Sequence, residues 1–157
     1  MNFIKIKKLD IPALIKIRME FLKEEHAEAT DAQFQNIERR LPKFFRKHLN
    51  KDFFAYLCYD GQVVAGVFLA VTEKPANLNL LTGKIGTIYN VYTAPEHRKK
   101  GIAKTLMKMA MNDAAKMDLS YLELKATKAG EPLYKSLGFS YDDSPYKPMK
   151  YVFSAIK

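Results

Sequence analysis

Cysteine is nearly absent from this chain of 157 residues, in which Cys58 is the only one. It lies inside the apolar run "FFAYLCYD", so neither a disulfide nor a cysteine-ligated zinc site can form within one chain. Histidine is scarce too, with three residues, and His48 and His97 have no second ligand at the spacing of a metal site. These scarcities predict no metal and suit a reducing cytoplasm.

Long apolar runs are also missing, and none approaches the roughly 20 residues of a membrane-spanning helix. The N-terminus "MNFIKIKKLD" alternates apolar residues with lysine and lacks the sustained apolar core of a signal peptide. We therefore expect a soluble cytoplasmic protein with no membrane partner.

Acidic residues are outnumbered, because 26 Lys and Arg stand against 17 Asp and Glu and give a net charge of +9. Such an excess favours acidic partners such as phosphates or nucleic acid. The chain has no RNP-like, KH-like or zinc-finger pattern, and its lysines are spread along the sequence. We therefore expect no specific nucleic-acid partner.

The pattern of apolar residues predicts a single mixed α/β domain over residues 1–157. Alternating or β-branched patterns predict strands at residues 4–6, 53–59, 62–72, 84–93, 120–126, 139–143 and 149–156. Helical spacing and capping residues predict helices from about residue 10 to 25, from 30 or 31 to a break at Pro42, over 44–49, from about 101, and over 130–138. Asp60-Gly61 predicts a hairpin between the second and third strands.

This order, β-α-α-β-β-β-α-β-α-β-β with a further short helical piece after Pro42, fixes the kind of sheet that we expect. Consecutive strands in the middle of the chain should pair antiparallel, and the helix that starts near Gly101 should connect a parallel pair. That helix should bury Ile102, Leu106, Met109 and Ala110.

The stretch "EHRKKGIAKTLMKMA", residues 96–110, gathers cations at the start of that helix. The positive end of a helix dipole disfavours cations, so the cluster needs an explanation. Exposed N–H groups at a helix start, next to a glycine that permits close approach, form an anion cradle, and a bound pyrophosphate would account for the lysines. The alternative is a solvated basic turn before an ordinary core helix.

Two motifs in sequence order resemble those of the GNAT superfamily of N-acetyltransferases. The first is Arg98-x-x-Gly101-x-Ala103, at the start of the central helix, and the second is Leu133-Tyr134-x-x-x-Gly138-Phe139. The resemblance extends to the expected element order along nearly all of the chain. It implies a GNAT-like fold with a splayed parallel pair, acetyl-CoA as cosubstrate, and transfer of an acetyl group to an amine by direct attack in a ternary complex.

The resemblance also implies which residues bind the cosubstrate. Residues 91–93 would pair with the pantetheine arm, and a bulge at Asn90 or Val91 would polarise the thioester carbonyl. Family members often carry an asparagine after the fifth strand; here Lys128 lies near that place and could reach a phosphate instead. The implied cosubstrate-binding residues are Val91, Tyr92, Thr93, Arg98, Lys99, Lys100, Gly101, Ile102, Ala103, Lys104 and Lys128.

The resemblance gives Tyr134 the role of general acid. A thiol has a reference pKa near ~8.5, so a departing CoA thiolate gains from a phenol proton. An amine like that of lysine, with a pKa near ~10.4, needs a base or a water chain, and Glu123 occupies a strand position at which some family members place a carboxylate base. The plainer alternatives are a core tyrosine and a surface carboxylate paired with lysine.

The acceptor has no signature in the sequence. We expect a primary amine of a small molecule; acetylation of a protein N-terminus or lysine, or an acyl-CoA-binding sensor without turnover, are the alternatives. Acyl-chain preference is open, as is the choice between monomer and homodimer. The cluster Glu24, Glu25, His26 and Glu28 could attract a cationic amine or form a polar helix end.

Overall fold

The computed structural model describes residues 1–8 and 10–153, and these fall into two compact units, Met1–Lys125 and Ala126–Lys157. The units are described one at a time. The elements of the first unit are β1 (Asn2–Lys5), α1 (Ile11–Glu25), α2 (Asp31–Glu38), α3 (Leu41–His48), β2 (Phe53–Asp60), β3 (Gln62–Glu73), β4 (Lys84–Thr93), the 3₁₀ turn η1 (Pro95–His97), α4 (Ile102–Ala114) and β5 (Tyr121–Glu123).

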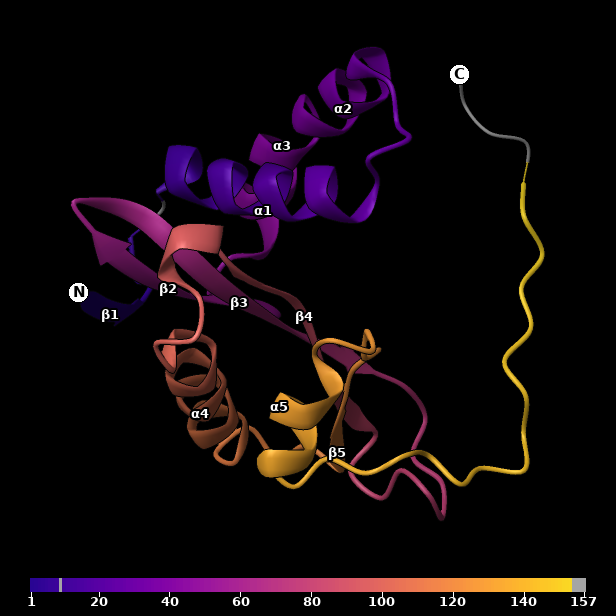
Figure 1. The fold of residues 1–157 in the computed structure, drawn as a ribbon. Helices are drawn as coiled ribbons and strands as arrows, with labels where there is room; N and C mark the ends of the chain where they lie inside the picture. The colour runs from indigo at the N-terminus through magenta and orange to yellow at the C-terminus, as the bar shows by residue number, and fades with distance from the viewer. Residues whose placement is uncertain (9, 154–157) are drawn as a thin grey trace. The chain divides into compact units, whose positions relative to one another are not determined.

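The first unit is built on a five-stranded sheet in the order β1-β2-β3-β4-β5 (Figure 1). Neighbouring strands are antiparallel except for β4 and β5, which are parallel and connected by α4. The mixed sheet expected from the sequence is therefore confirmed. The hairpin between β2 and β3 is confirmed as well, and Gly61 takes the left-handed φ of 75° that this tight turn requires.

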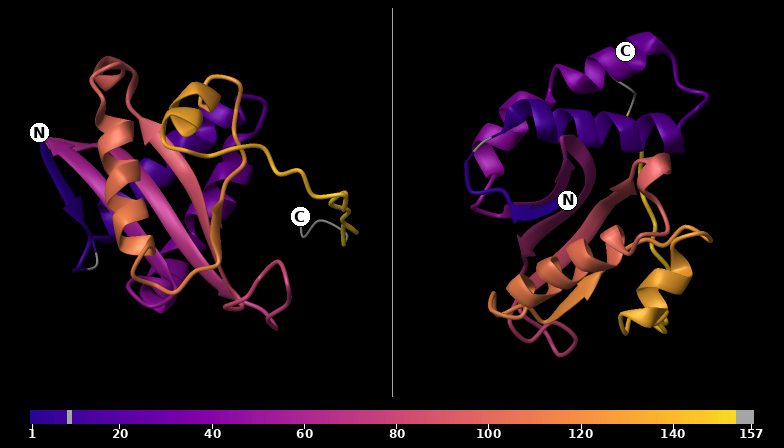
Figure 2. Two further views of the ribbon diagram at one scale, coloured as in Figure 1. Left: turned by 90° about the horizontal axis from the view of Figure 1, so that it is seen from below. Right: turned by 60° about the vertical axis from the view of Figure 1, so that its left-hand side comes forward.

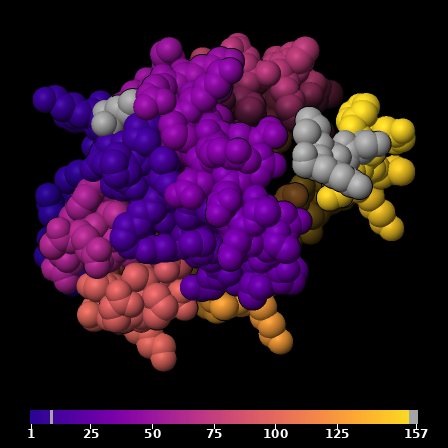
Figure 3. Space-filling view, turned by 90° about the horizontal axis from the view of Figure 1, so that it is seen from above, coloured from indigo at the N-terminus to yellow at the C-terminus, as the bar shows by residue number. Residues whose placement is uncertain are grey.

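Helices cover both faces of this sheet. The helix α4 packs on β2, β3 and β4 from one side, whereas α1 packs on β3 and β4 from the other (Figures 1 and 2). Seen from the side of α1, the indigo and purple residues of α1 to α3 hide most of the sheet (Figure 3). The core on this side holds the fully buried side chains of Ile17, Phe45, Phe53 and Phe68.

The buried stripe of α4 differs from the expected one at two methionines. Ile102, Leu106 and Ala110 are buried as predicted, but Met107 is fully buried and Met109 only partly. Met107 lies three residues before Ala110 and seven before the buried Ala114, so it shares their face of the helix.

Local capping explains where the first helices begin. The Asp10 carboxylate accepts from the Ala13 N–H at 3.1 Å, and Thr30 forms a capping box with Gln33, so both predicted N-caps are confirmed. The break at Pro42 takes a different form from the expected one. α2 already ends at Glu38, and Pro42 lies in the first turn of α3, where its missing N–H costs nothing.

The second unit contains one helix, α5 (Glu131–Ser136), among its described residues. The strands expected at residues 139–143 and 149–156 are wrong for residues 139–143 and 149–153, which form no strand, and residues 154–156 lie outside the described part. Residues 140–153 are exposed, and the chain turns where the Ser144 N–H donates to the Asp142 carboxylate at 3.0 Å. Pro145 and Pro148 interrupt the segment between the two expected strands, so alternation alone overstated its tendency to pair.

Candidate active site

The strand β4 contains a bulge opposite β3. Phe68 lies opposite Tyr89 and Gly66 opposite Tyr92, so β4 contains one residue more than β3 between these two pairs. Asn90 lies in this bulge with a φ of 56° and a side chain that is 1% exposed. A bulge at Asn90 or Val91 is what the family resemblance had led us to expect.

The pairing of β4 with β5 is short. Only Ile85, Gly86 and Thr87 have partners on β5, so the same edge of β4 has no strand neighbour at residues 88–93 among the described residues. Unpaired backbone groups at a strand edge can bind an extended ligand as an additional strand. Residues 91–93, the expected pantetheine site, lie on this open edge.

The turn before α4 presents a row of free donors. Within the described part of the chain, none of the backbone N–H groups of residues 99–104 donates to a protein group, and Gly101 provides no side-chain cap. Lys99 and Gly101 are both left-handed, with φ of 60° and 76°. A Cβ built on Gly101 would meet nothing within 4 Å, so the space before the helix start is open. Consecutive amides of this kind form an anion-binding nest.

Arg98, which opens the first motif, has its side chain engaged within the protein. Its Nε donates to the Thr93 carbonyl at 2.8 Å, and its Nη2 contacts the Glu24 carboxylate at 2.5 Å. The guanidinium therefore fastens the basic turn to the end of β4 and to the last turn of α1. The lysines of the expected cradle, Lys99, Lys100 and Lys104, are instead exposed.

Glu123 ends β5 at the place where the sheet opens. Its carboxylate accepts a hydrogen bond from the Thr87 hydroxyl at 3.2 Å, and its side chain is exposed. Because side chains alternate along a strand, Thr87 and Tyr89 point to the same face of β4. That face is the α1 side, since the Tyr89 ring packs on Phe53 and Phe68.

Arg18 on α1 is a site residue that our sequence reasoning missed. Its Nη1 donates to the Asn90 side-chain oxygen at 3.2 Å, and its guanidinium lies 5.7 Å from the centre of the Phe21 ring. Desolvation lowers the pKa of Arg18, against the opposing influence of Tyr89 and Glu25. Arg18 lies at helical spacing between Leu14 and Phe21, so a cation within the apolar stripe of α1 was the available signal.

The second unit holds Tyr134 in a well-defined local setting. The Phe139 N–H donates to the Tyr134 carbonyl and the Gly138 N–H to the Lys135 carbonyl, both at 3.0 Å, which is a Schellman motif with Gly138 at φ 94°. The Phe139 ring packs edge-on against Tyr134, with 6.2 Å between centroids. The spacing of the second motif therefore ends α5 and positions its tyrosine. Lys128, in the turn before α5, is exposed.

The tyrosine ring also covers Gly130, the residue at the N-cap of α5. A Cβ built on Gly130 would lie 2.9 Å from Cε2 of Tyr134 and 3.3 Å from its hydroxyl oxygen. A side chain at this position would have to displace the Tyr134 ring, so a glycine here leaves room for the tyrosine.

Comparison with known families decides what these features belong to. Residues 11–139 match the model of the acetyltransferase (GNAT) family. The chain belongs to that family. The match includes both sequence motifs and the β4 bulge. A search among curated proteins finds no match to this acetyltransferase-family chain.

Solved structures agree with this assignment. A predicted acetyltransferase from Clostridium acetobutylicum, solved with acetyl-CoA, is 29% identical to this GNAT domain, with a TM-score of 0.80 and 95% of each chain covered. A GCN5-related N-acetyltransferase from Ralstonia eutropha is 26% identical, with a TM-score of 0.69 over 94% of this chain and 97% of that one. Glucosamine-6-phosphate N-acetyltransferase from Arabidopsis thaliana, at 21% identity and a TM-score of 0.68 over 96% and 99%, shares the fold.

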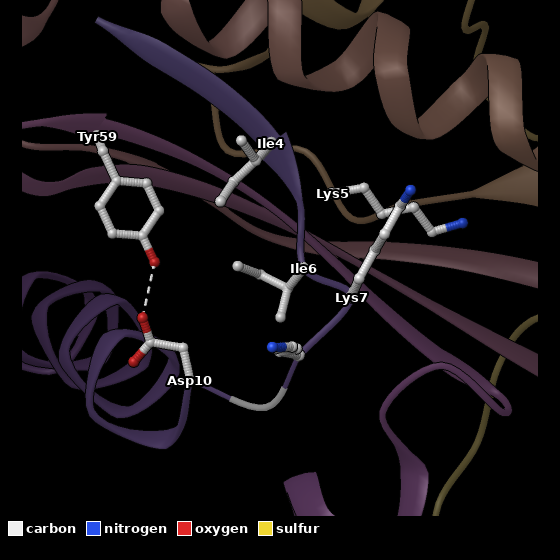
Figure 4. Close-up of a pocket in the computed structure, with 7 residues that line it drawn as sticks. Ile4, Lys5, Ile6, Lys7, Asp10 and Tyr59 are labelled. Carbon is white, nitrogen blue, oxygen red and sulfur yellow. Dashed lines mark hydrogen bonds between the residues drawn. The ribbon is translucent and has the colours of Figure 1, made fainter.

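The first unit also contains a cavity of about 540 Å³, away from the β4 bulge and the turn before α4 (Figure 4). It is lined by residues 4–8, Asp10 and Tyr59, at β1, which is the opposite edge of the sheet from β5. The Tyr59 hydroxyl donates to Asp10 at 3.1 Å, and burial together with this bond raises the pKa of Tyr59 to about 12. Because Asp10 also caps α1, these groups serve the fold of the GNAT domain.

Among residues 1–8 and 10–153, no group of three His, Cys, Asp or Glu side chains is placed to hold a metal, and no helix there is long and apolar enough to cross a membrane. Cys58 is fully buried, and desolvation raises the pKa of its thiol. It is therefore poorly suited to act as a nucleophile.

Proposed function

We propose that this chain is an N-acetyltransferase that transfers the acetyl group of acetyl-CoA to a primary amine of a small molecule by direct attack in a ternary complex. The observation that carries the proposal is the row of backbone donors at residues 99–104 that have no partner within the described part of the chain and that follow the open edge of β4. The 29% identical Clostridium acetobutylicum structure contains acetyl-CoA, which supports this choice of cosubstrate.

The residues present fit acetyl-CoA. The amides of residues 99–104 would bind the pyrophosphate, and the exposed Lys99, Lys100 and Lys104 would add positive charge around it. The open edge at residues 91–93 would pair with the amides of the pantetheine arm. For Arg98 we propose a role in fixing this turn through Glu24 and Thr93, and for Lys128 a contact with a phosphate.

The transfer needs polarisation of the thioester, a neutral amine and a stabilised leaving thiolate. A backbone N–H in the bulge at residues 90–91 would polarise the carbonyl. Glu123, directly or through a water chain, would accept the proton from the amine, and the Tyr134 hydroxyl would donate to the departing sulfur. No covalent intermediate on the protein is required. We also propose that both units belong to one domain, since the family match includes parts of each.

The test of this function is thiol release from acetyl-CoA in the presence of a panel of primary amines, with peptides carrying a free N-terminus or lysine as a second arm. Tyr134→Phe should lower kcat by about 10²-fold or more while acetyl-CoA binding persists. Tyr146→Phe, at an exposed tyrosine of the same unit, is the matched control and should be neutral.

Each contrary result removes a defined part of the proposal. An unchanged rate in Tyr134→Phe removes the general acid, and transfer confined to peptides removes the small-molecule acceptor. If the chain binds acetyl-CoA but acetylates none of the acceptors, the result favours the alternative of an acyl-CoA-binding sensor without turnover.

The proton acceptor has its own signature in the pH dependence. An alkylamine deprotonates without help as the pH approaches its pKa near ~10.4. The loss of rate in Glu123→Gln should therefore be largest near neutral pH and shrink as the pH rises toward that value. A loss of equal size at every pH would overturn the role of Glu123 as base.

A further inference from the structure

Arg18 is a half-buried cation that forms no ion pair with any described residue. Among the described residues no carboxylate lies within the 4.0 Å of an ion pair with its guanidinium, and the one hydrogen bond that it makes goes to the neutral Asn90 amide. Glu25, seven residues further along α1, acts on it only from beyond that distance. Burying a charge without a partner is unfavourable, and desolvation accordingly lowers the pKa of Arg18.

Asn90, which accepts this hydrogen bond, is also a buried polar residue with unused hydrogen-bond donors among the described residues. Asn90 is 1% exposed, and its Nδ2, which carries two N–H donors, has no partner among the described residues. The residue also has a left-handed φ of 56°, a conformation that asparagine adopts more readily than most other residues with a side chain. The protein therefore holds Arg18 against the bulge with a buried amide that is itself incompletely hydrogen-bonded among the described residues.

The position of Arg18 connects it with the acceptor rather than with the cosubstrate. It reaches the bulge from α1, on the face of β4 to which Tyr89 and Thr87 point. On that face Thr87 holds the carboxylate of Glu123, the proposed base. An amine directed at the bulge from this side would therefore meet two side chains that are bonded to β4 near Tyr89: Glu123 of β5, which is bonded to Thr87, and Arg18 of α1, which is bonded to Asn90.

We propose that the Arg18 guanidinium binds a carboxylate of the acceptor, so that the acceptor is a small amine that also carries a carboxylate. This inference rests on the proposed function and deepens it. A guanidinium has five N–H donors in a planar fork that matches a carboxylate, and Arg18 uses one of them within the described residues. The two groups that counteract the lowering of its pKa, Tyr89 and Glu25, are both acidic. A single positive charge suits a carboxylate better than a phosphate dianion.

The experiment compares matched acceptors that differ in the anionic group. Lysine is paired with cadaverine, ornithine with putrescine, histidine with histamine, and each of the common amino acids with its amide; glucosamine 6-phosphate paired with glucosamine is the phosphate arm. Thiol release gives kcat/KM for each member with the unmodified chain, with Arg18→Met and with Arg18→Lys. Lys23→Met, at an exposed cation of the same helix, is the matched control.

The unmodified chain should prefer the carboxylate member of at least one pair by about tenfold or more. Arg18→Met should abolish that preference by raising KM for the carboxylate member, with little change for its partner. Arg18→Lys keeps the charge without the planar fork and should retain part of the preference, and Lys23→Met should retain all of it. Equal kcat/KM within every pair, an equal fall of both members in Arg18→Met, or a preference for the phosphate member would overturn the inference.

A second arm needs no turnover and separates this inference from the proposed function. Binding of the same pairs, and of the N-acetyl amino acids beside their amides, is measured by saturation-transfer NMR on the chain saturated with CoA. Carboxylate-dependent binding that disappears in Arg18→Met supports the carboxylate site even if none of the tested amines gives thiol release. The lack of thiol release would then count only against the proposed enzymatic function. No carboxylate-dependent binding overturns the site even if other amines are acetylated.

Discussion

Replacement of Gly101 by leucine tests the cradle before α4, and the chain supplies a close control in Gly61. Both glycines are left-handed, with φ of 76° and 75°, and a Cβ at either position would meet nothing within 4 Å. Leucine in this conformation costs about 1–2 kcal/mol, so Gly101→Leu and Gly61→Leu should lower the free energy of unfolding by similar amounts. Urea denaturation measures this loss.

The two variants should differ in their affinity for CoA. A side chain at position 101 projects into the open space in front of the helix start, where the pyrophosphate would receive hydrogen bonds from the amides of residues 99–104. A hydrogen bond to a charged group contributes about 1.5–3 kcal/mol, so the loss of two corresponds to at least about a hundredfold weaker binding. Gly61→Leu, in the β2–β3 hairpin, should leave the affinity unchanged.

Calorimetric titration with CoA decides between the interpretations. An unchanged affinity in Gly101→Leu would refute the cradle, and an equal loss of affinity in both variants would show that the effect follows from general destabilisation. Either result would return the basic turn to a solvated surface feature.

Three further predictions concern the stability of the fold. Tyr56→Phe should destabilise the chain by about 1–2 kcal/mol at neutral pH, since the Tyr56 hydroxyl donates to the Asp113 carboxylate at 2.9 Å. Burial works to raise the pKa of Asp113, but hydrogen bonds from Lys5 and Tyr56 outweigh it and leave that pKa lowered. The difference in unfolding free energy between the unmodified chain and Tyr56→Phe should therefore be at its maximum above the unfolded pKa of Asp near ~3.9, and it should vanish as the pH falls below the folded pKa of Asp113. Gly138→Ala places a Cβ at φ 94° and should cost about 1 kcal/mol, seen as faster hydrogen exchange in α5. Glu24→Gln should change the unfolding free energy by less than about 1 kcal/mol, because both partners of its ion pair with Arg98 are roughly half exposed and the charges are screened.

Local signals were sufficient for most elements of the first unit. The caps at Asp10 and Thr30, the hairpin at Gly61 and the start of α4 after Gly101 each depend on residues a few positions apart, and the structure confirms them. The second motif is also local, because Gly138 and Phe139 close the helix that carries Tyr134. Such features are encoded where they occur, so a single sequence is enough to find them.

Other features depend on partners that are distant in sequence. Whether the alternating stretch at residues 149–153 forms a strand depends on a partner edge, and no pattern within those residues specifies one. Arg18 reaches Asn90 across 72 residues of sequence, so its contact with the bulge could not be read from the helix that carries it. The spacing of apolar residues predicts which face of α1 is buried, but it does not predict which strand residues that face contacts.

The bulge in β4 has a consequence for the strand as a whole, because it acts as a phase shift in the alternation of side chains. Tyr89 and Tyr92 are three residues apart, which in a regular strand would send them to opposite faces, yet both contact the core under α1. Deleting one residue between them would reverse the faces to which the following side chains point, so that Tyr92 and Ala94 would face away from that core. The extra residue therefore keeps the core-facing side chains after the bulge, in the segment that leads to the basic turn, on the same side of the sheet as those before it.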